Sequence, residues 1–355
     1  MTSPDHDQHD DQHDDQQHDQ HDDQHESSTG GAGTSRVGVR RVVVAAASLV
    51  VVLVAAVSSW AGIRASHPAY LLVLVVIVLV AVTVLSVWGG RAWEGRAVPR
   101  GPRSVRTTVR TLLAGTALVV VIAVVMYFRP LTASPSAVAQ LVDDADVEVT
   151  ESLTSIEFAP SAGATTGLVF YPGALVDPRA YAPTLRPLAE AGYLVVVVKM
   201  PMGVAFFGAG AASDVIADHP TIEHWAVGGH SLGGAVASIY ARDHRGEGGV
   251  DGLVLWAAYP TGPMADAADL AVVSVSAAND GLATPDDIAA SVADLPATAE
   301  FVTVPGAVHA FFGDYGDQRG DGDPTVSRQD AQAQIVEATS TFLASLPARH
   351  TASDE

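Results

Sequence analysis

The sequence has 355 residues, a formal net charge of −21 at neutral pH and no cysteine. The lack of cysteine excludes disulfide bonds, thiolate metal sites and cysteine nucleophiles, so any catalytic chemistry must come from serine, histidine and carboxylate side chains. The acidic balance argues against nucleic acid as a partner, because phosphate recognition needs a basic surface. Apolar residues make up 48% of the chain, which suits a membrane-attached protein.

Residues 1–35 form a low-complexity tail of Asp, His and Gln. The tail carries 10 acidic residues and no basic ones, and it has too few apolar side chains to offset the entropy cost of ordering, so it is predicted to be disordered. It is either a simple solvated tail or a weak metal buffer, since its histidines have no fixed geometry that would select an ion. These histidines are His6, His9, His13, His18, His21 and His25.

Residues 36–132 contain three apolar runs, at 42–61, 70–88 and 112–128. Each run approaches the ~20 residues that a helix needs to cross a bilayer, and none contains a charged side chain. We therefore expect a transmembrane anchor of three helices. A transporter or sensor is the alternative, but no ionisable residue inside the runs marks a pathway.

The arginines around these runs predict an orientation. Six of them, from Arg91 to Arg110, lie between the second and third runs, and only Arg64 lies between the first and second. Cytoplasmic flanks collect positive charge, so the tail and the arginine-rich loop are expected in the cytoplasm. The prediction is a multi-pass cell-membrane protein whose domain at 133–355 lies outside the cytoplasm.

Residues 133–355 alternate apolar, strand-like runs with helix-like segments. Continuous Val and Leu runs separated by helices are typical of buried parallel strands in an α/β fold. Two earlier segments with alternating polarity, at 146–152 and 155–160, predict an antiparallel hairpin at the sheet edge. The other expected strands are 167–171, 193–199, 224–229, 252–258, 270–277 and 299–304. The expected helices are 179–191, 210–218, 232–243, 285–293 and 327–346.

The segment "GHSLG" at 229–233 places Ser231 between an expected strand and an expected helix. It fits the G-x-S-x-G pattern, in which small neighbours allow a sharp turn that projects a nucleophilic serine. The alternative is an ordinary glycine-rich bend, because such a match arises easily by chance in a glycine-rich chain. The context of strand, turn and helix favours the catalytic interpretation.

A serine nucleophile needs a histidine base, which in turn needs an orienting carboxylate. Asp280 and His309 follow successive later strands, in the order serine, acid, histidine. The alternatives are a loop-capping role for Asp280 and a structural role for His309. The backbone amides of Leu232 and Ala174 are the candidate oxyanion donors, with an ordinary Pro-Gly turn as the alternative at Ala174.

Four strings carry a resemblance to a known family. They are "VFYPGALVDPRAYAPTLRPLAEAGYLVVVVKMP", "WAVGGHSLGGAVAS", "LVLWAAYP" and "VHAFFGDYGDQRGDGDPTVSR". Over about 166–346 the chain resembles the α/β-hydrolase superfamily, and more narrowly its small dienelactone-hydrolase-like members. The resemblance implies an α/β-hydrolase fold, with Ser231 as nucleophile, Asp280 as acid, His309 as base, and Leu232 with Ala174 as the oxyanion hole. Relatives commonly have Pro-Gly-Gly where this chain has Pro-Gly-Ala, and the N-terminal segments lie outside the resemblance.

These observations predict a membrane-anchored serine hydrolase that cleaves small carboxylic esters without a cofactor. Only a short segment separates the strand at 252–258 from the next, so no large lid is expected. Aromatic residues near the catalytic loops, Phe206, Phe207, Trp256 and Phe311, are candidates for an acyl pocket, or else plain core. An acyltransferase with the same triad and a catalytically silent, membrane-tethered binding module are the alternative functions.

One loop, 313–324, is rich in aspartate. Asp314, Asp317, Asp321 and Asp323 resemble an oxygen-rich cation site but lack the spacing and closing glutamate of an EF-hand. No metal site is therefore assigned to it.

Overall fold

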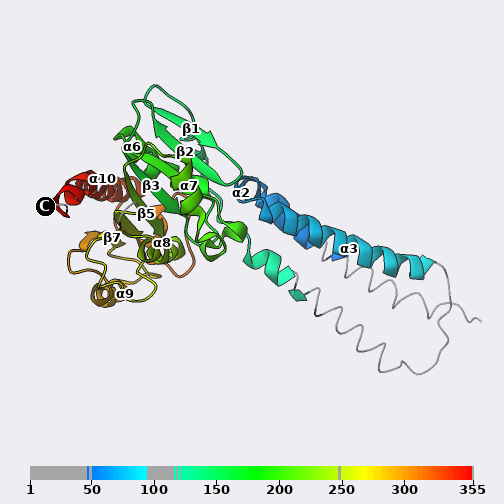
Figure 1. Cartoon of the computed structure of the whole chain (residues 1–355). Coiled ribbons are helices and arrows are strands. Elements are labelled where there is room, and N and C mark those ends of the chain that lie inside the picture. The colour runs from blue at the N-terminus through cyan, green and yellow to red at the C-terminus, as the bar shows by residue number, and fades with distance from the viewer. Residues whose placement is uncertain are drawn as a thin grey trace, which may run out of the picture.

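The computed structural model describes residues 50–93, 122–246 and 249–353, together with a few isolated positions. The N-terminal part includes helices α2 (Trp60–Ala65) and α3 (Ala69–Trp93), and α3 extends away from the remaining domain as a long rod (Figure 1). Counting only the described residues, no helix has both the length and the apolar character to cross a membrane. The predicted tail, and parts of the predicted runs 42–61 and 112–128, lie outside the described residues.

The domain is built on one sheet of eight strands in the order β1-β2-β4-β3-β5-β6-β7-β8. β1 and β2 form an antiparallel hairpin, β2 pairs antiparallel with β4, and every other neighbouring pair is parallel. The predicted parallel sheet with an antiparallel edge hairpin is thus confirmed. The strands are β1 (Val147–Glu151), β2 (Ser155–Pro160), β3 (Thr166–Tyr171), β4 (Leu194–Val198), β5 (His224–His230), β6 (Gly252–Trp256), β7 (Ala271–Ala277) and β8 (Glu300–Val304).

Helices cover both faces of the sheet (Figure 1). β3 shows why the central strands of the sheet are apolar at every position. Leu168 and Phe170 belong to the core on one face of the sheet, and Val169 and Tyr171 belong to the core on the other face. The first core includes side chains of α6 (Ala182–Glu190) and α10 (Arg328–Ser353), and the second includes side chains of α7 (Ala211–Asp218) and α8 (Leu232–Asp243). A parallel strand covered on both faces needs apolar residues at every position, which explains the unbroken runs in the sequence.

The helices follow the predicted order with small changes at their ends. The helix expected at 179–191 is divided into a 3-10 turn and an α-helix. The segment 257–270 between β6 and β7 contains no helix or strand, in agreement with the expected absence of a large lid. The α-helices of the domain are α5 (Pro135–Val138), α6 (Ala182–Glu190), α7 (Ala211–Asp218), α8 (Leu232–Asp243), α9 (Pro285–Ser291) and α10 (Arg328–Ser353). The 3-10 turns are η1 (Pro178–Tyr181), η2 (Pro201–Gly203), η3 (Ala205–Gly208), η4 (Val292–Asp294) and η5 (His309–Phe312).

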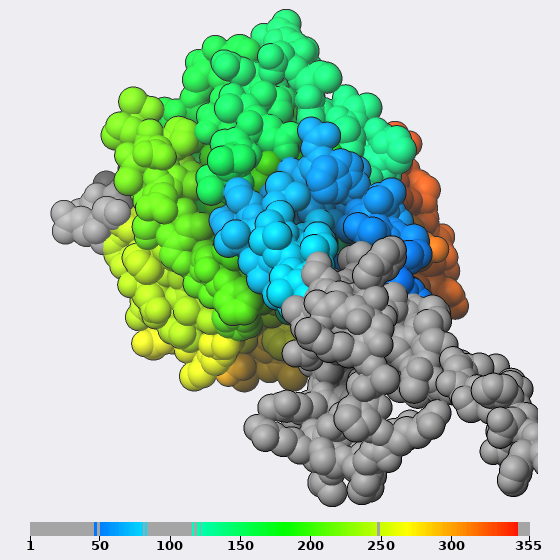
Figure 2. Space-filling model, turned by 90° about the vertical axis from the view of Figure 1, so that its right-hand side faces the viewer, coloured from blue at the N-terminus to red at the C-terminus, as the bar shows by residue number. Residues whose placement is uncertain are grey.

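The described N-terminal helices pack against the domain near its early strands. In Figure 2, which faces the right-hand side of Figure 1, the blue and cyan surface of these helices stands in front of the green surface of the domain. Figure 1 shows that the α2 end lies at the domain and that the cyan end of α3 lies far from it. The contacts include α3 with η2, which follows the carboxyl end of β4. Because the carboxyl ends of parallel strands carry the candidate catalytic loops, the helices meet the domain at the edge where catalysis is expected.

Candidate active site

Ser231 lies at the corner between β5 and α8, with φ 54° and ψ −123°. A non-glycine residue with such angles is strained by roughly 1–3 kcal/mol, which is the backbone expected of a nucleophile elbow. The flanking glycines are required by close packing. A Cβ atom at Gly229 would lie 2.4 Å from the carbonyl carbon of Gly233, and one at Gly233 would lie 2.0 Å from the backbone oxygen of Tyr171. The pentapeptide therefore forms the predicted turn, and its glycines let the two backbones pass.

Asp280 and His309 form a buried pair. Nδ1 of His309 lies 2.8 Å from Oδ2 of Asp280, and both side chains are almost inaccessible to solvent. Oδ1 of Asp280 accepts hydrogen bonds from the backbone amides of Leu282 and Ala283, each at 2.8 Å. The carboxylate is thus fixed by its own loop, and its other oxygen orients the imidazole with Nε2 left to act on a substrate.

His230 connects this pair to the serine. Its ring centroid lies 4.5 Å from that of His309, and it directly precedes Ser231 in the chain. The residue before Ser231 thus lies next to His309, which brings the loops after β5, β7 and β8 together. On its other side His230 stacks on Phe312, with 5.5 Å between ring centroids.

The protonation state of His230 follows from its surroundings. The amide of Gly173 donates to the Tyr181 hydroxyl at 2.8 Å, and the same hydroxyl lies 2.9 Å from Nδ1 of His230. Burial and, to a lesser extent, the imidazole of His309 hold the pKa of His230 well below its usual value, against a smaller opposing effect of a backbone group of His309. Burial thus favours the neutral form of His230.

The loop after β3 carries Ala174, the candidate for the second oxyanion donor. The amide of Leu175 donates to Gly203 at 2.8 Å, and the amide of Val176 donates to Gly173 at 3.1 Å. The amide of Gly173 donates to the Tyr181 hydroxyl. Within 173–176, this leaves the amide of the exposed residue Ala174 as the one without an acceptor in the described part of the chain. The amide of Leu232 begins α8, where helical N–H groups have no partner within the helix. Ala174 and Leu232 are thus both available to an oxyanion.

Asp321 is a further site residue that the sequence did not reveal. Its Oδ1 accepts the amide of His309 at 3.0 Å and that of Gly281 at 3.3 Å, and its Oδ2 accepts the amide of Ala310 at 2.8 Å. One carboxylate thus joins the loop of the acid to the loop of the base. The pattern of acidic residues drew attention to this loop, but as a possible cation site.

The other aspartates of the 313–324 loop do not gather around a common point. Asp314 accepts hydrogen bonds from the hydroxyls of Ser134 and Ser136, at 2.6 and 2.9 Å. Asp317 and Asp323 are exposed. Within the described residues, no group of three or more His, Asp or Glu side chains is placed to hold a metal ion.

The predicted pocket residues are placed in different environments. Trp256 is fully buried, with Nε1 donating to the Thr339 hydroxyl at 3.0 Å, so it belongs to the core and does not line an open pocket. It packs there because β6 is a central strand covered on both faces. Phe311 is also buried, beneath the guanidinium of Arg328 at 4.5 Å. Phe206 and Phe207, on η3, are 50% and 65% exposed and remain candidates for contact with a substrate.

Comparison with known proteins agrees with this architecture. The family described as "Alpha/beta hydrolase family" matches residues 167–333. Solved structures that are similar include a dienelactone hydrolase-like promiscuous phosphotriesterase from metagenomic libraries, which is 18% identical, with 57% of this chain and 97% of that chain covered and a TM-score of 0.42. Est1E from Butyrivibrio proteoclasticus is 13% identical, and the similarity covers 56% of this chain and 100% of that chain with a TM-score of 0.39. A comparison with curated proteins found no match. Residues 167–333 thus match the alpha/beta hydrolase family, and the domain that contains them has the alpha/beta hydrolase fold.

Proposed function

We propose that the protein is a serine hydrolase that cleaves carboxylic esters, with Ser231 as nucleophile, His309 as base and Asp280 as the orienting acid. The observation that carries this proposal is the buried pair of His309 and Asp280, 2.8 Å apart, beside the strained turn that holds Ser231. The family match at 167–333 supports a hydrolase in general.

The proposed reaction has two halves. Nε2 of His309 takes the hydroxyl proton of Ser231 as Oγ attacks the carbonyl carbon of the ester. The resulting oxyanion accepts hydrogen bonds from the backbone amides of Leu232 and Ala174. Collapse of this intermediate expels the alcohol, which takes the proton from His309, and leaves an acyl group on Ser231. Water then gives a proton to His309 and attacks the acyl carbon, which releases the acid and restores the serine.

A fluorophosphonate probe and a panel of p-nitrophenyl esters of graded acyl length test the proposal on the full chain in detergent. The expected result is covalent labelling and ester cleavage, both abolished in Ser231→Ala. Ser238→Ala is a suitable control, because Ser238 lies on α8 and donates to Ala235 within that helix. An unlabelled wild-type protein, or labelling that survives in Ser231→Ala, would refute the proposal.

We further propose that residues 36–132 anchor the enzyme in the cell membrane through three helices, with the hydrolase domain outside the cytoplasm. Support comes from the three uncharged apolar runs and from exposed apolar side chains on α3 such as Leu72 and Leu79, which are 66% and 60% exposed. Carbonate washing of membranes, followed by protease treatment of intact cells, tests both statements. Release by carbonate would exclude the anchor, and protection of the domain from external protease would exclude the orientation.

A further inference from the structure

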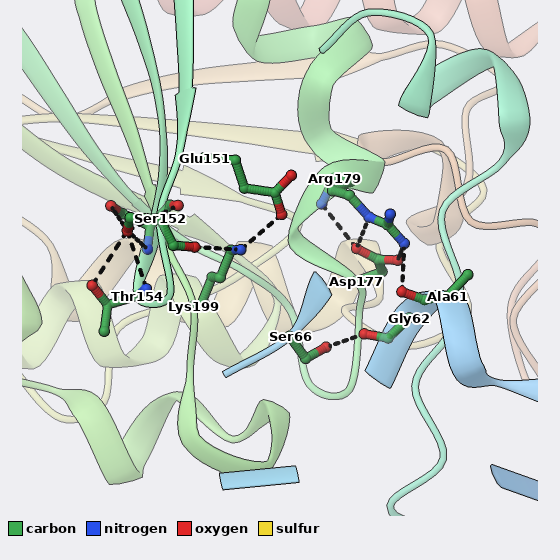
Figure 3. Close-up of polar contacts among 10 residues, drawn as sticks. Ala61, Gly62, Ser66, Glu151, Ser152, Thr154, Asp177, Arg179 and Lys199 are labelled. Atoms are coloured by element: carbon green, nitrogen blue, oxygen red, sulfur yellow. Dashed lines mark hydrogen bonds and ion pairs between the residues drawn. The ribbon is translucent and has the colours of Figure 1, made fainter. Parts of the chain in front are cut away.

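Asp177 and Arg179 form an ion pair at the start of η1. Nη2 of Arg179 lies 2.7 Å from Oδ2 of Asp177, and the Asp177 side chain is fully buried. Oδ1 of Asp177 also accepts the backbone amide of Arg179 at 3.1 Å. Burial of Asp177, partial burial of Arg179 and several hydrogen bonds hold this pair in one geometry. We call these two residues the clamp (Figure 3).

The clamp reaches out of the hydrolase domain to α2. The same Nη2 of Arg179 donates to the backbone oxygen of Ala61 at 2.9 Å, as Figure 3 shows. The next residue, Gly62, faces the domain closely: a Cβ atom there would lie 3.3 Å from Pro130 and 3.6 Å from Oδ2 of Asp177. A small cavity beside it is lined by Ser66, at the end of α2, and by Gly173. Helix α2 therefore lies directly on the loop that follows β3.

Backbone hydrogen bonds also hold the chain just after Ala174. Leu131, in the segment between the N-terminal helices and the domain, donates its amide to Leu175 at 2.7 Å and accepts the amide of Asp177 at 2.9 Å. Leu175 has φ 61°, a conformation that a leucine keeps only when its surroundings impose it. The strained Leu175, next to the candidate oxyanion donor, is thus held through its amide by Gly203 and through its carbonyl oxygen by Leu131.

The turn η1 carries these contacts to the catalytic centre. It begins directly after Asp177 and ends at Tyr181, whose hydroxyl accepts the Gly173 amide and contacts His230. Displacement of Arg179 would therefore move both ends of the segment 173–181. An amide donor stabilises an oxyanion only when it is held in the correct position before the reaction.

We propose that Arg179 is a positioning residue that couples helix α2 to the oxyanion loop, so that the N-terminal helices set the catalytic rate and not only the location of the enzyme. This inference rests on the proposed ester hydrolysis for its kinetic consequence. Its structural part, the coupling of α2 to residues 173–177, does not depend on that reaction.

The test uses the full chain in detergent micelles and the variants Arg179→Ala, Arg179→Lys and Gly62→Ala. We expect kcat for p-nitrophenyl acetate to fall at least about fivefold in Arg179→Ala with KM changed less than about twofold, because an oxyanion donor acts mainly in the transition state. Arg179→Lys should recover part of this loss, since an ammonium can keep one of the two contacts. Gly62→Ala should also lower kcat, because it displaces α2 while it leaves the clamp charges unchanged.

Arg242→Ala is the matched control. Arg242 also donates to a backbone oxygen, that of Thr261 at 2.8 Å, and pairs with a neighbouring carboxylate, but it lies in the last turn of α8. Hydrogen exchange of the backbone amides within 172–179, which all residues there except the two prolines carry, is the second measurement and should accelerate in Arg179→Ala and not in Arg242→Ala. A kcat equal to that of the control, or unchanged exchange at 172–179, overturns the coupling. A wild-type protein without esterase activity would instead refute the proposed function, and the exchange measurement would still decide the coupling.

Discussion

The hydroxyl of Tyr181 lies 2.9 Å from Nδ1 of His230, and both side chains are fully buried. This single contact joins the turn η1 to the strand that delivers the candidate nucleophile. Because the same hydroxyl accepts the amide of Gly173, it also fixes the loop that carries Ala174. The site is therefore ordered by polar groups that take no part in the proposed chemistry.

Tyr181→Phe removes this shared hydroxyl. The Gly173 amide and Nδ1 of His230 would both lose their partner in a buried place, so we expect the free energy of unfolding to fall by about 1–3 kcal/mol. Ester turnover should fall roughly tenfold through kcat, because the oxyanion loop loses a fixed contact. Thermal unfolding and ester kinetics measure the two effects. Tyr193→Phe, which removes a hydroxyl that donates to Ser340, is the control, and equal kinetic losses in the two variants would contradict the prediction.

His230 makes stability depend on pH. Burial and the neighbouring imidazole hold its pKa well below 6.5, so between that value and the lowered pKa the unfolded chain binds a proton that the folded protein does not. The free energy of unfolding should therefore fall as pH is lowered below 6.5, by at most about 1.4 kcal/mol per pH unit from this group. In His230→Asn the decline measured by urea unfolding between pH 6.5 and about 5.5 should be shallower. Parallel curves for variant and wild type would show that His230 is not the cause.

Asp280→Asn tests the orientation of the base. The amide side chain can occupy the same space but carries no charge to stabilise an imidazolium. Its NH2 group, if it faces His309, donates to Nδ1 and favours the wrong tautomer, so kcat should fall by about 10²–10⁴-fold. Folding should be largely retained, which circular dichroism and fluorophosphonate labelling under prolonged exposure would establish. A variant with more than half of the wild-type kcat would remove Asp280 from the proposed triad.

Asp321→Asn tests the link between the acid and base loops. The change leaves one oxygen in place of two, so Gly281, His309 and Ala310 cannot all keep their acceptor. We expect kcat to fall about tenfold and the melting temperature to drop by several degrees, since hydrogen bonds to a charged acceptor are worth roughly 1.5–3 kcal/mol. Asp323→Asn, on an exposed side chain of the same loop, should leave both unchanged. Similar behaviour of the two variants would count against a special role for Asp321.

Much of the fold could be predicted because each element has a local cause. The apolar runs that became β3 and β4 are covered on both faces, and the hairpin of β1 and β2 alternates because one of its faces is less buried. The corner at Ser231 was expected because a glycine-flanked serine lay between a strand and a helix. The roles of Ser231, Asp280 and His309 in catalysis remain predictions, although their placement agrees with them.

The supporting residues could not be predicted in the same way. Asp321, Tyr181 and His230 act through contacts with backbone groups or side chains far away in sequence, and such contacts leave no spacing pattern. Trp256 illustrates the opposite error, because an aromatic residue at the end of a strand looks the same in the sequence whether it lines a pocket or fills the core. The burial of Trp256 becomes evident only from the position of α10, whose Thr339 accepts the hydrogen bond of its Nε1.

Lys199 has a practical consequence for the study of this protein. It is the single lysine of the chain, and its ammonium is buried against Glu151 and the backbone oxygen of Ser152, both at 2.8 Å (Figure 3). Amine-directed cross-linkers therefore find no accessible lysine with which to join two copies, and a negative result with such reagents would not show that the protein is monomeric. Carboxylate-directed or photoactivated cross-linkers suit this acidic surface better and should be used to determine its assembly.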